Sequence, residues 1–244
     1  MKKVVIAPDS FKGTLSSAEV CGIVKDVLVK KYGEIEVTEI PIADGGEGMT
    51  DSFLYAFTNS RKVYMKAQSP LGREIDVYYG IIEGDTAVIE MAAASGITIE
   101  EKNNAVKAST YGTGEMIKHA LDSGIRKFVI GIGGSATTDG GIGCTAALGG
   151  SFLNKKGESV ALCGEGLKDI ESIDLSGLDE RLKASEITVL GDVKNPLYGK
   201  RGAAYIFGPQ KGADPKTVEF LDAGLFNLAE KAEEYLKKDY SQYE

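Results

Sequence analysis

Residues 127–150 read KFVIGIGGSATTDGGIGCTAALGG, and this stretch decides how the rest of the chain is interpreted. It opens with the apolar run at 128–130, the pattern of a buried parallel strand. A loop rich in glycine, hydroxyl groups and one acid follows, and a helix-like segment covers 144–148. Because glycine lacks a Cβ and tolerates positive φ, the N–H groups of such a loop can converge on an anion such as phosphate. The alternative is a tight strand-to-helix connection, but a connection alone does not need so many glycines, since each costs conformational entropy.

Two more polar loops follow predicted strands near the start of the chain. Residues 4–7 form a predicted strand before loop 9–13, and residues 37–42 form another before loop 44–48. Ligands of open α/β sheets bind at the carboxyl ends of the strands, so we expect both loops at one sheet edge. Capping and turn roles explain each loop residue separately, but they explain the clustering poorly.

The order of the elements predicts an α/β fold in two lobes. Residues 61–91 alternate apolar and polar positions around two turns, as in an antiparallel meander, and we place a domain boundary near Asn59. The N-terminal part, 1–59, is then a partial α/β lobe, and 60–244 is a doubly wound lobe with an antiparallel β extension. Further predicted strands cover 187–190 and 205–207, and Asp214 with Pro215 starts the last helix.

Composition excludes several classes of protein. Acids outnumber bases, 36 to 28, which argues against a nucleic-acid or membrane partner. The three cysteines form no CxxC pair and are interpreted as reduced thiols of a cytoplasmic protein. The one histidine, His119, is predicted to be a surface residue of a helix, which makes a Ser-His-Asp triad or a histidine-ligated zinc site untenable.

The remaining motifs favour phosphoryl transfer over redox chemistry. No GxxxxGK[ST] motif is present, which excludes a P-loop kinase. Residues 131–136 fit GxGxxG/A, but the acidic partner of a dinucleotide site is missing near Asn154, so an oxidoreductase is a poor second choice. Phosphoryl transfer needs donors and cations around the phosphoryl group and acids for a metal or a hydroxyl. The chain offers candidates of both kinds, namely the cations Lys12, Lys194 and Lys211 and the acids Asp9, Asp44, Asp139 and Asp192.

Seven segments, in order, resemble the glycerate kinase family of bacterial organic-acid kinases, which is unrelated to P-loop kinases. They are APDSFKGTLSS, IPIADGGEG, MAAASG, STYGTGE, GIGGSATTDGG, GDVKNPLYG and FGPQKGA. The resemblance implies ATP-dependent phosphorylation of D-glycerate, with ATP and Mg²⁺ as cofactors and a flavodoxin-like lobe inserted into a second lobe. The binding residues that it implies are Asp9, Ser10, Asp44, Gly45, Gly46, Glu47, Gly133, Gly134, Ser135, Thr137, Thr138, Asp139, Gly140, Asn195, Gln210 and Lys211.

For catalysis we single out Lys12, Asp192 and Lys194. Lys12 is the candidate cation for the phosphoryl group or the glycerate carboxylate, and Asp192 is the candidate acid that orients the hydroxyl or holds Mg²⁺. Asp139 is a second candidate for the metal. A structural salt bridge between Lys12 and Asp192 is the alternative.

The chain departs from the family in its length, because members continue well past the last helix. We therefore expect an open sheet edge in the N-terminal lobe, which favours a homodimer or poor solubility. The alternative function is a truncated or non-catalytic α/β fragment that binds a nucleotide or a small acid without turnover.

Overall fold

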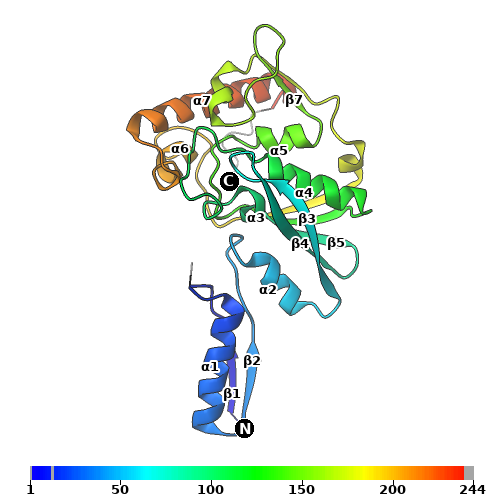
Figure 1. The fold of residues 1–244 in the computed structure, drawn as a ribbon, viewed down its shortest axis with the longest axis vertical. Helices are drawn as coiled ribbons and strands as arrows, with labels where there is room; N and C mark the ends of the chain where they lie inside the picture. The colour runs from blue at the N-terminus through cyan, green and yellow to red at the C-terminus, as the bar shows by residue number, and fades with distance from the viewer. Residues whose placement is uncertain (1, 12–13, 239–244) are drawn as a thin grey trace.

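The protein, described by a computed structural model over residues 2–11 and 14–238, has a mixed α/β fold with sheets of two, five and two strands. The first sheet pairs β1 (Lys2–Ile6) in parallel with β2 (Ile35–Glu39). The helix α1 (Ser17–Tyr32) connects them. It begins with a capping box between Ser16 and Glu19 and ends at Gly33, whose φ is +70°. Figure 1 shows this unit, in blue, extending away from the larger body of the molecule.

The five-stranded sheet forms the centre of the larger body, in the order β3-β4-β5-β6-β9. The strands β3 (Ser60–Gln68), β4 (Glu74–Ile82) and β5 (Thr86–Glu90) are antiparallel, which confirms the predicted meander. The strands β5, β6 (Lys127–Gly131) and β9 (Glu186–Leu190) run parallel. Their last residues are in register across the sheet, so three carboxyl ends meet at one edge.

Helices pack on both faces of this sheet, although much of the edge strand β9 is exposed. On one face, α4 (Tyr111–Asp122) contacts β3 and the short α5 (Ile142–Ala147), and Met116 and Phe128 belong to the same core. On the other face, α2 (Met49–Ala56) packs through Met49 against β4 and β5. Because α2 contacts this sheet, part of the predicted first lobe already belongs to the larger body. The boundary near Asn59 stays a prediction.

A second layer lies beyond α5. It contains α6 (Ala203–Phe207), the long α7 (Pro215–Leu236) and the pair β7 (Ser151–Leu153) and β8 (Ser172–Asp174). Short helices complete the fold, namely α3 (Ala92–Ser95), η1 (Gly164–Asp169), η2 (Glu180–Ala184) and η3 (Pro209–Lys211). As predicted, the Asp214 side chain caps α7, and it accepts a hydrogen bond from the Thr217 N–H at 2.7 Å. Within the described residues, none of the helices combines the length and apolar character needed to cross a membrane.

The predicted strand at 205–207 is wrong, because these residues belong to the helix α6. A short apolar run does not distinguish a strand from a buried helix turn. Here Ala203 and Ala204 start the helix, and Ala204 is fully buried in a core that includes Leu221 and Leu225 of α7. Contact with α7 therefore selects the helical conformation.

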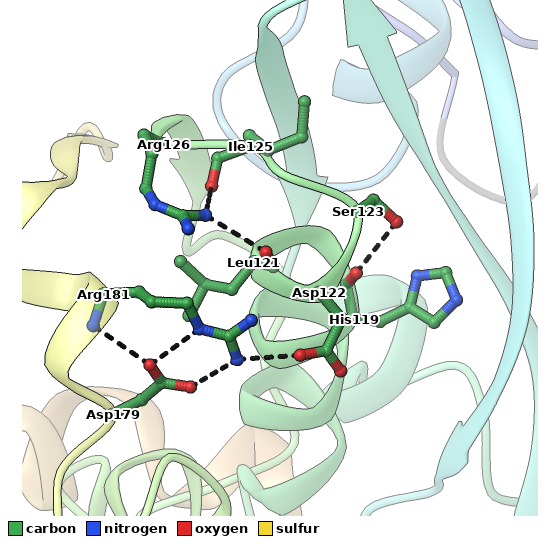
Figure 2. A network of polar contacts seen from close by, with 8 residues as sticks. All are labelled: His119, Leu121, Asp122, Ser123, Ile125, Arg126, Asp179 and Arg181. Carbon is green, nitrogen blue, oxygen red and sulfur yellow. Dashed lines mark hydrogen bonds and ion pairs between the residues drawn. The ribbon is translucent and has the colours of Figure 1, made fainter.

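A polar network fastens the segment around η2 to α4 (Figure 2). The Arg181 guanidinium donates to Asp179 and, at 2.7 Å, to Asp122 at the end of α4. These bonds from Arg181 lower the pKa of Asp179 to about 2. The predicted surface histidine is half-buried rather than free on the surface, since His119 Nδ1 lies 3.0 Å from the Tyr79 hydroxyl. The network lies apart from the glycine-rich loops and has a structural role.

The β1-α1-β2 unit leaves apolar side chains in water, which predicts self-association. Val5 of β1 is 64% exposed and Val27 of α1 is 59% exposed. We expect the chain to associate reversibly at micromolar concentrations in analytical ultracentrifugation, because such faces gain free energy when they are covered. The Val27→Lys variant should associate more weakly, and Lys30→Gln on the same helix is the control. A monodisperse wild-type monomer would contradict this prediction.

Candidate functional site

A cavity of about 520 Å³ lies at the carboxyl ends of β6 and β9. It is lined by loop residues and by residues of α6, η3 and α7. The predicted site residues among them are Asp44, Gly133, Gly134, Ser135, Thr137, Thr138, Asp139, Gly140, Asp192, Asn195, Gln210 and Lys211. The chain therefore brings most of its predicted site together at the edge where ligands of such sheets bind.

The two glycine-rich loops lock together at this edge. The Gly133 N–H donates to the Gly45 carbonyl at 3.0 Å. A Cβ on Gly131 would lie 2.3 Å from that same carbonyl oxygen, and a Cβ on Gly45 would lie 2.7 Å from the Leu190 oxygen. Glycine at these positions is required for backbone-to-backbone contact, and it fixes the 44–48 loop across the ends of β6 and β9.

Asp139 organises the second half of the loop from within. Its side chain is 1% exposed. It accepts hydrogen bonds from the Thr110 N–H (2.8 Å), the Thr110 hydroxyl (2.7 Å), the Gly141 N–H (3.1 Å) and the Gly143 N–H (3.3 Å). Burial raises the pKa of Asp139, and these bonds oppose the rise. Both carboxylate oxygens are thus engaged in joining α4 to the loop and to the start of α5.

Lys211 supplies a buried cation. Its Nζ donates to the Ser135 hydroxyl at 2.9 Å and to the Thr137 carbonyl at 2.6 Å, and the residue is 7% exposed. Burial lowers its pKa to about 8, and the nearby charge of Asp139 opposes that shift. The ammonium lines the cavity, so it both fastens η3 to the loop and places positive charge beside the cavity.

The loop keeps a hydrogen-bond donor for a ligand. Among the described residues, the buried Thr138 hydroxyl has no hydrogen-bond partner. Buried polar groups are normally satisfied, so an unpartnered hydroxyl next to an ammonium marks a candidate anion-binding site.

The acids at the mouth of the cavity are Asp44 and Asp192. Both are exposed and line it, one from the loop after β2 and the other from the loop after β9. The side-chain NH₂ group of Asn195 donates a hydrogen bond to the Arg201 carbonyl at 2.9 Å and so closes the loop after β9. Two exposed carboxylates thus line the same cavity as the Lys211 ammonium.

Some predicted residues lie elsewhere. Ser10 and Glu47 line a separate cavity on the other side of the 44–48 loop. Gly45 and Gly46 are packed between the loops, and Asp9 accepts from the Ser10 N–H at 2.7 Å. Lys194 is an exposed residue outside the lining of both cavities. Lys12 lies outside the described residues.

Sequence reasoning missed Glu90 and Thr110. Glu90 is 8% exposed, and its carboxylate accepts from the Gly48 and Thr50 N–H groups at the start of α2. A charged residue as the last position of a buried strand was the signal for Glu90. Nothing in the sequence indicated that the Thr110 hydroxyl would bond to Asp139.

These features define a mixed α/β protein with a candidate anion site in glycine-rich loops at the carboxyl edge of its central sheet. The chain belongs to the glycerate kinase family, whose sequence model matches residues 4–244. It is 44% identical over 234 residues to a glycerate kinase from Haemophilus influenzae, covering 95% of this chain and 62% of the relative. It is 42% identical over 245 residues to one from Bacillus subtilis, covering 99% and 64%.

A solved structure has the same fold. A crystal structure of a protein from Salmonella typhimurium LT2, assigned as glycerate kinase 2, superposes with a TM-score of 0.87 at 43% identity. The match covers 99% of this chain and 65% of that one. The chain therefore spans a little less than two thirds of the length of the relatives that it matches.

The lowered pKa of Lys211 predicts how stability depends on pH. Between about 8 and its unfolded value of about 10.5, the unfolded state binds more protons at this lysine than the folded state, so its contribution to stability rises with pH. In urea unfolding from pH 7.5 to 10.5, wild type should gain stability relative to Lys211→Met. The variant Lys216→Met, at an exposed position, is the control, and its stability should change with pH in the same way as that of wild type. If the stability of Lys211→Met changed with pH in parallel with that of wild type, a buried and charged Lys211 would be excluded.

Proposed function

We propose that this chain takes part in ATP-dependent phosphorylation of D-glycerate, as a phosphotransferase with an alcohol acceptor. The proposal rests on one observation above the others. The buried Lys211 ammonium and the unpartnered Thr138 hydroxyl line the same cavity as Asp192, in a chain of the glycerate kinase family. Donors, a cation and an acid around one cavity are the parts that phosphoryl transfer needs.

On the basic side of the cavity, the chain's own groups bind negative charge. Thr137, Thr138 and the Lys211 ammonium line the cavity and are suited to phosphate oxygens of the nucleotide. Because Asp139 and Lys211 already hold the loop in place, the donors need little rearrangement when the charge of the transferring group develops. The D-glycerate carboxylate is an anion of the same kind and belongs in this cavity too.

On the acidic side, Asp192 is the candidate to orient the attacking hydroxyl of D-glycerate. A carboxylate placed beside an alcohol accepts its hydrogen bond and then its proton as the new P–O bond forms. Asp192 follows the carboxyl end of β9 and lines the cavity, as this role requires. Lys12 remains a proposed cation from the resemblance alone, and Lys194 is the least supported of the three because it does not line the cavity.

The acids at the cavity mouth also fit a nucleotide-bound Mg²⁺. Mg²⁺ is usually held by one or two carboxylates together with phosphates and water, and it neutralises charge on the phosphates. Asp44 and Asp192 are exposed carboxylates of this kind. Asp139 is not, since both its oxygens accept hydrogen bonds from Thr110 and the loop. Holding Mg²⁺ is the alternative role for Asp192, with Asp44 as the second acid, because a carboxylate that ligates the metal would not also take the hydroxyl proton.

Binding without turnover is the second candidate, because the chain spans under two thirds of its relatives' length. Release of ADP and formation of phosphoglycerate by the chain would establish turnover, and their absence would favour binding without turnover. Division into two lobes, a homodimer and a cytoplasmic location remain proposals from the sequence.

For turnover, Asp192→Asn is the most informative variant. We expect kcat/KM for D-glycerate to fall by about 10²–10⁴-fold, because the amide cannot take the hydroxyl proton. The melting temperature should stay near that of wild type, since Asp192 is exposed. The exposed Asp169→Asn variant loses the same charge away from the cavity and should keep wild-type kinetics. Near-normal turnover by Asp192→Asn would refute the assignment, and an equal loss of stability and activity would mark a structural role.

A further inference from the structure

Glu90 is a buried carboxylate beside the candidate site. It is the last residue of β5, lies in register with Gly131 of β6 and is 8% exposed. Because side chains alternate between the two faces of a strand, Glu90 lies on the same face as Val88, which belongs to one core with Met49 of α2. Burial of a charge is costly unless hydrogen bonds compensate for it, so Glu90 needs partners at this depth.

The start of α2 supplies the partners of Glu90. The Gly48 N–H lies 3.1 Å from each of the two carboxylate oxygens, and the Thr50 N–H donates to Oε2 at 3.2 Å. The first N–H groups of a helix have no acceptor within it, and Gly48, the residue before α2, has no side chain to cap them. Burial raises the pKa of Glu90, and the N–H groups of Thr50 and Gly48 oppose the rise. Glu90 therefore caps α2 from a distant strand.

Through Gly48, this cap fixes one end of the 44–48 loop. Gly48 has a φ of +89°, in the left-handed region, where the chain turns from the loop into α2. The middle of the loop is fixed separately, because the Gly45 carbonyl accepts a hydrogen bond from the Gly133 N–H. The loop is therefore fastened at two points, one against the loop after β6 and one against the end of β5.

Asp44 begins this loop and lines the cavity that contains Lys211. Its side chain accepts from the Gly46 N–H at 3.0 Å, so its position follows the path of the loop. Glu90 does not line that cavity. An effect of Glu90 on a ligand there is therefore transmitted by the loop.

We propose that Glu90 is a positioning residue for the candidate site, which fastens the 44–48 loop through the start of α2 and so keeps Asp44 at the cavity that contains Lys211. The role is distinct from that of Asp139, which orders the loop on the opposite side of the contact between the two loops. This inference rests on the proposed function, since it takes Asp44 as an acid for nucleotide-bound Mg²⁺.

The alternative is a cap with a structural role alone. A cap contributes to the free energy of unfolding, and its loss lowers the melting temperature. With that role alone, a folded variant would bind metal and phosphate as wild type does. Positioning predicts in addition that a folded variant has a less ordered loop and a weaker metal complex, and both can be measured well below the melting temperature.

Hydrogen exchange followed by mass spectrometry tests whether Glu90 orders the loop. In Glu90→Gln, one oxygen becomes an NH₂ group that faces N–H donors. We expect the amides of residues 44–50 to exchange about tenfold faster, the loss of about one hydrogen bond, with little change in the rest of the larger body. Glu115→Gln is the matched control and should leave exchange at 44–50 unchanged, because Glu115 accepts from the Gln68 N–H at 2.7 Å and lines neither cavity.

Binding of Mg²⁺ with inorganic pyrophosphate, measured by isothermal titration calorimetry on the whole chain, tests whether this order reaches Asp44. Glu90→Gln should raise the Kd about five- to tenfold. In the Asp44→Asn background, Glu90→Gln should have no further effect, because the acid that it positions is gone. Glu115→Gln should bind the probe as wild type does.

The outcomes separate this inference from the proposed function. Unchanged exchange at 44–50, an unchanged Kd, or an equal effect of Glu90→Gln with and without Asp44 would overturn the positioning role and leave phosphoryl transfer open. A wild-type chain that does not bind pyrophosphate would count against the proposed function, and faster exchange confined to 44–50 would still support the fastening of the loop by Glu90. If Glu90→Gln does not fold, the shorter Glu90→Asp takes its place with the same expected results.

Discussion

Four hydrogen bonds to one buried carboxylate hold the site together. Asp139 accepts from Thr110 at the start of α4 and from Gly141 and Gly143 at the start of α5. These donors come from helix starts, where backbone N–H groups have no partner within the helix. The carboxylate satisfies them in the interior and sets the path of the residues on either side. Everything proposed for Thr137, Thr138 and Lys211 depends on that path.

The second constraint is the contact between the two glycine-rich loops. Backbone lies against backbone at Gly45 and Gly133, and a single Cβ at Gly131 would separate them. The 44–48 loop also lies between two cavities at the edge of the sheet. One has the buried ammonium of Lys211, and the other has the buried carboxylate of Glu90.

Sequence reasoning predicted the strands and the loops at their ends well, because hydrophobic periodicity and strand polarity are local properties. The parallel strands at 127–131 and 186–190 and the cluster of polar loops beyond them illustrate this. It did not predict what each polar side chain does. Asp139 was a metal candidate, yet its oxygens accept hydrogen bonds from backbone N–H groups and the Thr110 hydroxyl. The depth at which Lys211 is buried depends on how η3 docks. The helix at 203–207 was missed for the same reason, since its conformation depends on α7.

The most direct test of this account is the free energy of unfolding of Asp139→Asn, measured by urea titration beside Asp222→Asn. Asparagine keeps one acceptor oxygen, so it can still accept the single bond that Asp222 receives from the Gly199 N–H. It cannot replace both oxygens of Asp139, and its NH₂ group would face N–H donors. The account predicts a loss of about 2 kcal/mol or more for Asp139→Asn and almost none for Asp222→Asn. Equal stability of the two variants would contradict it.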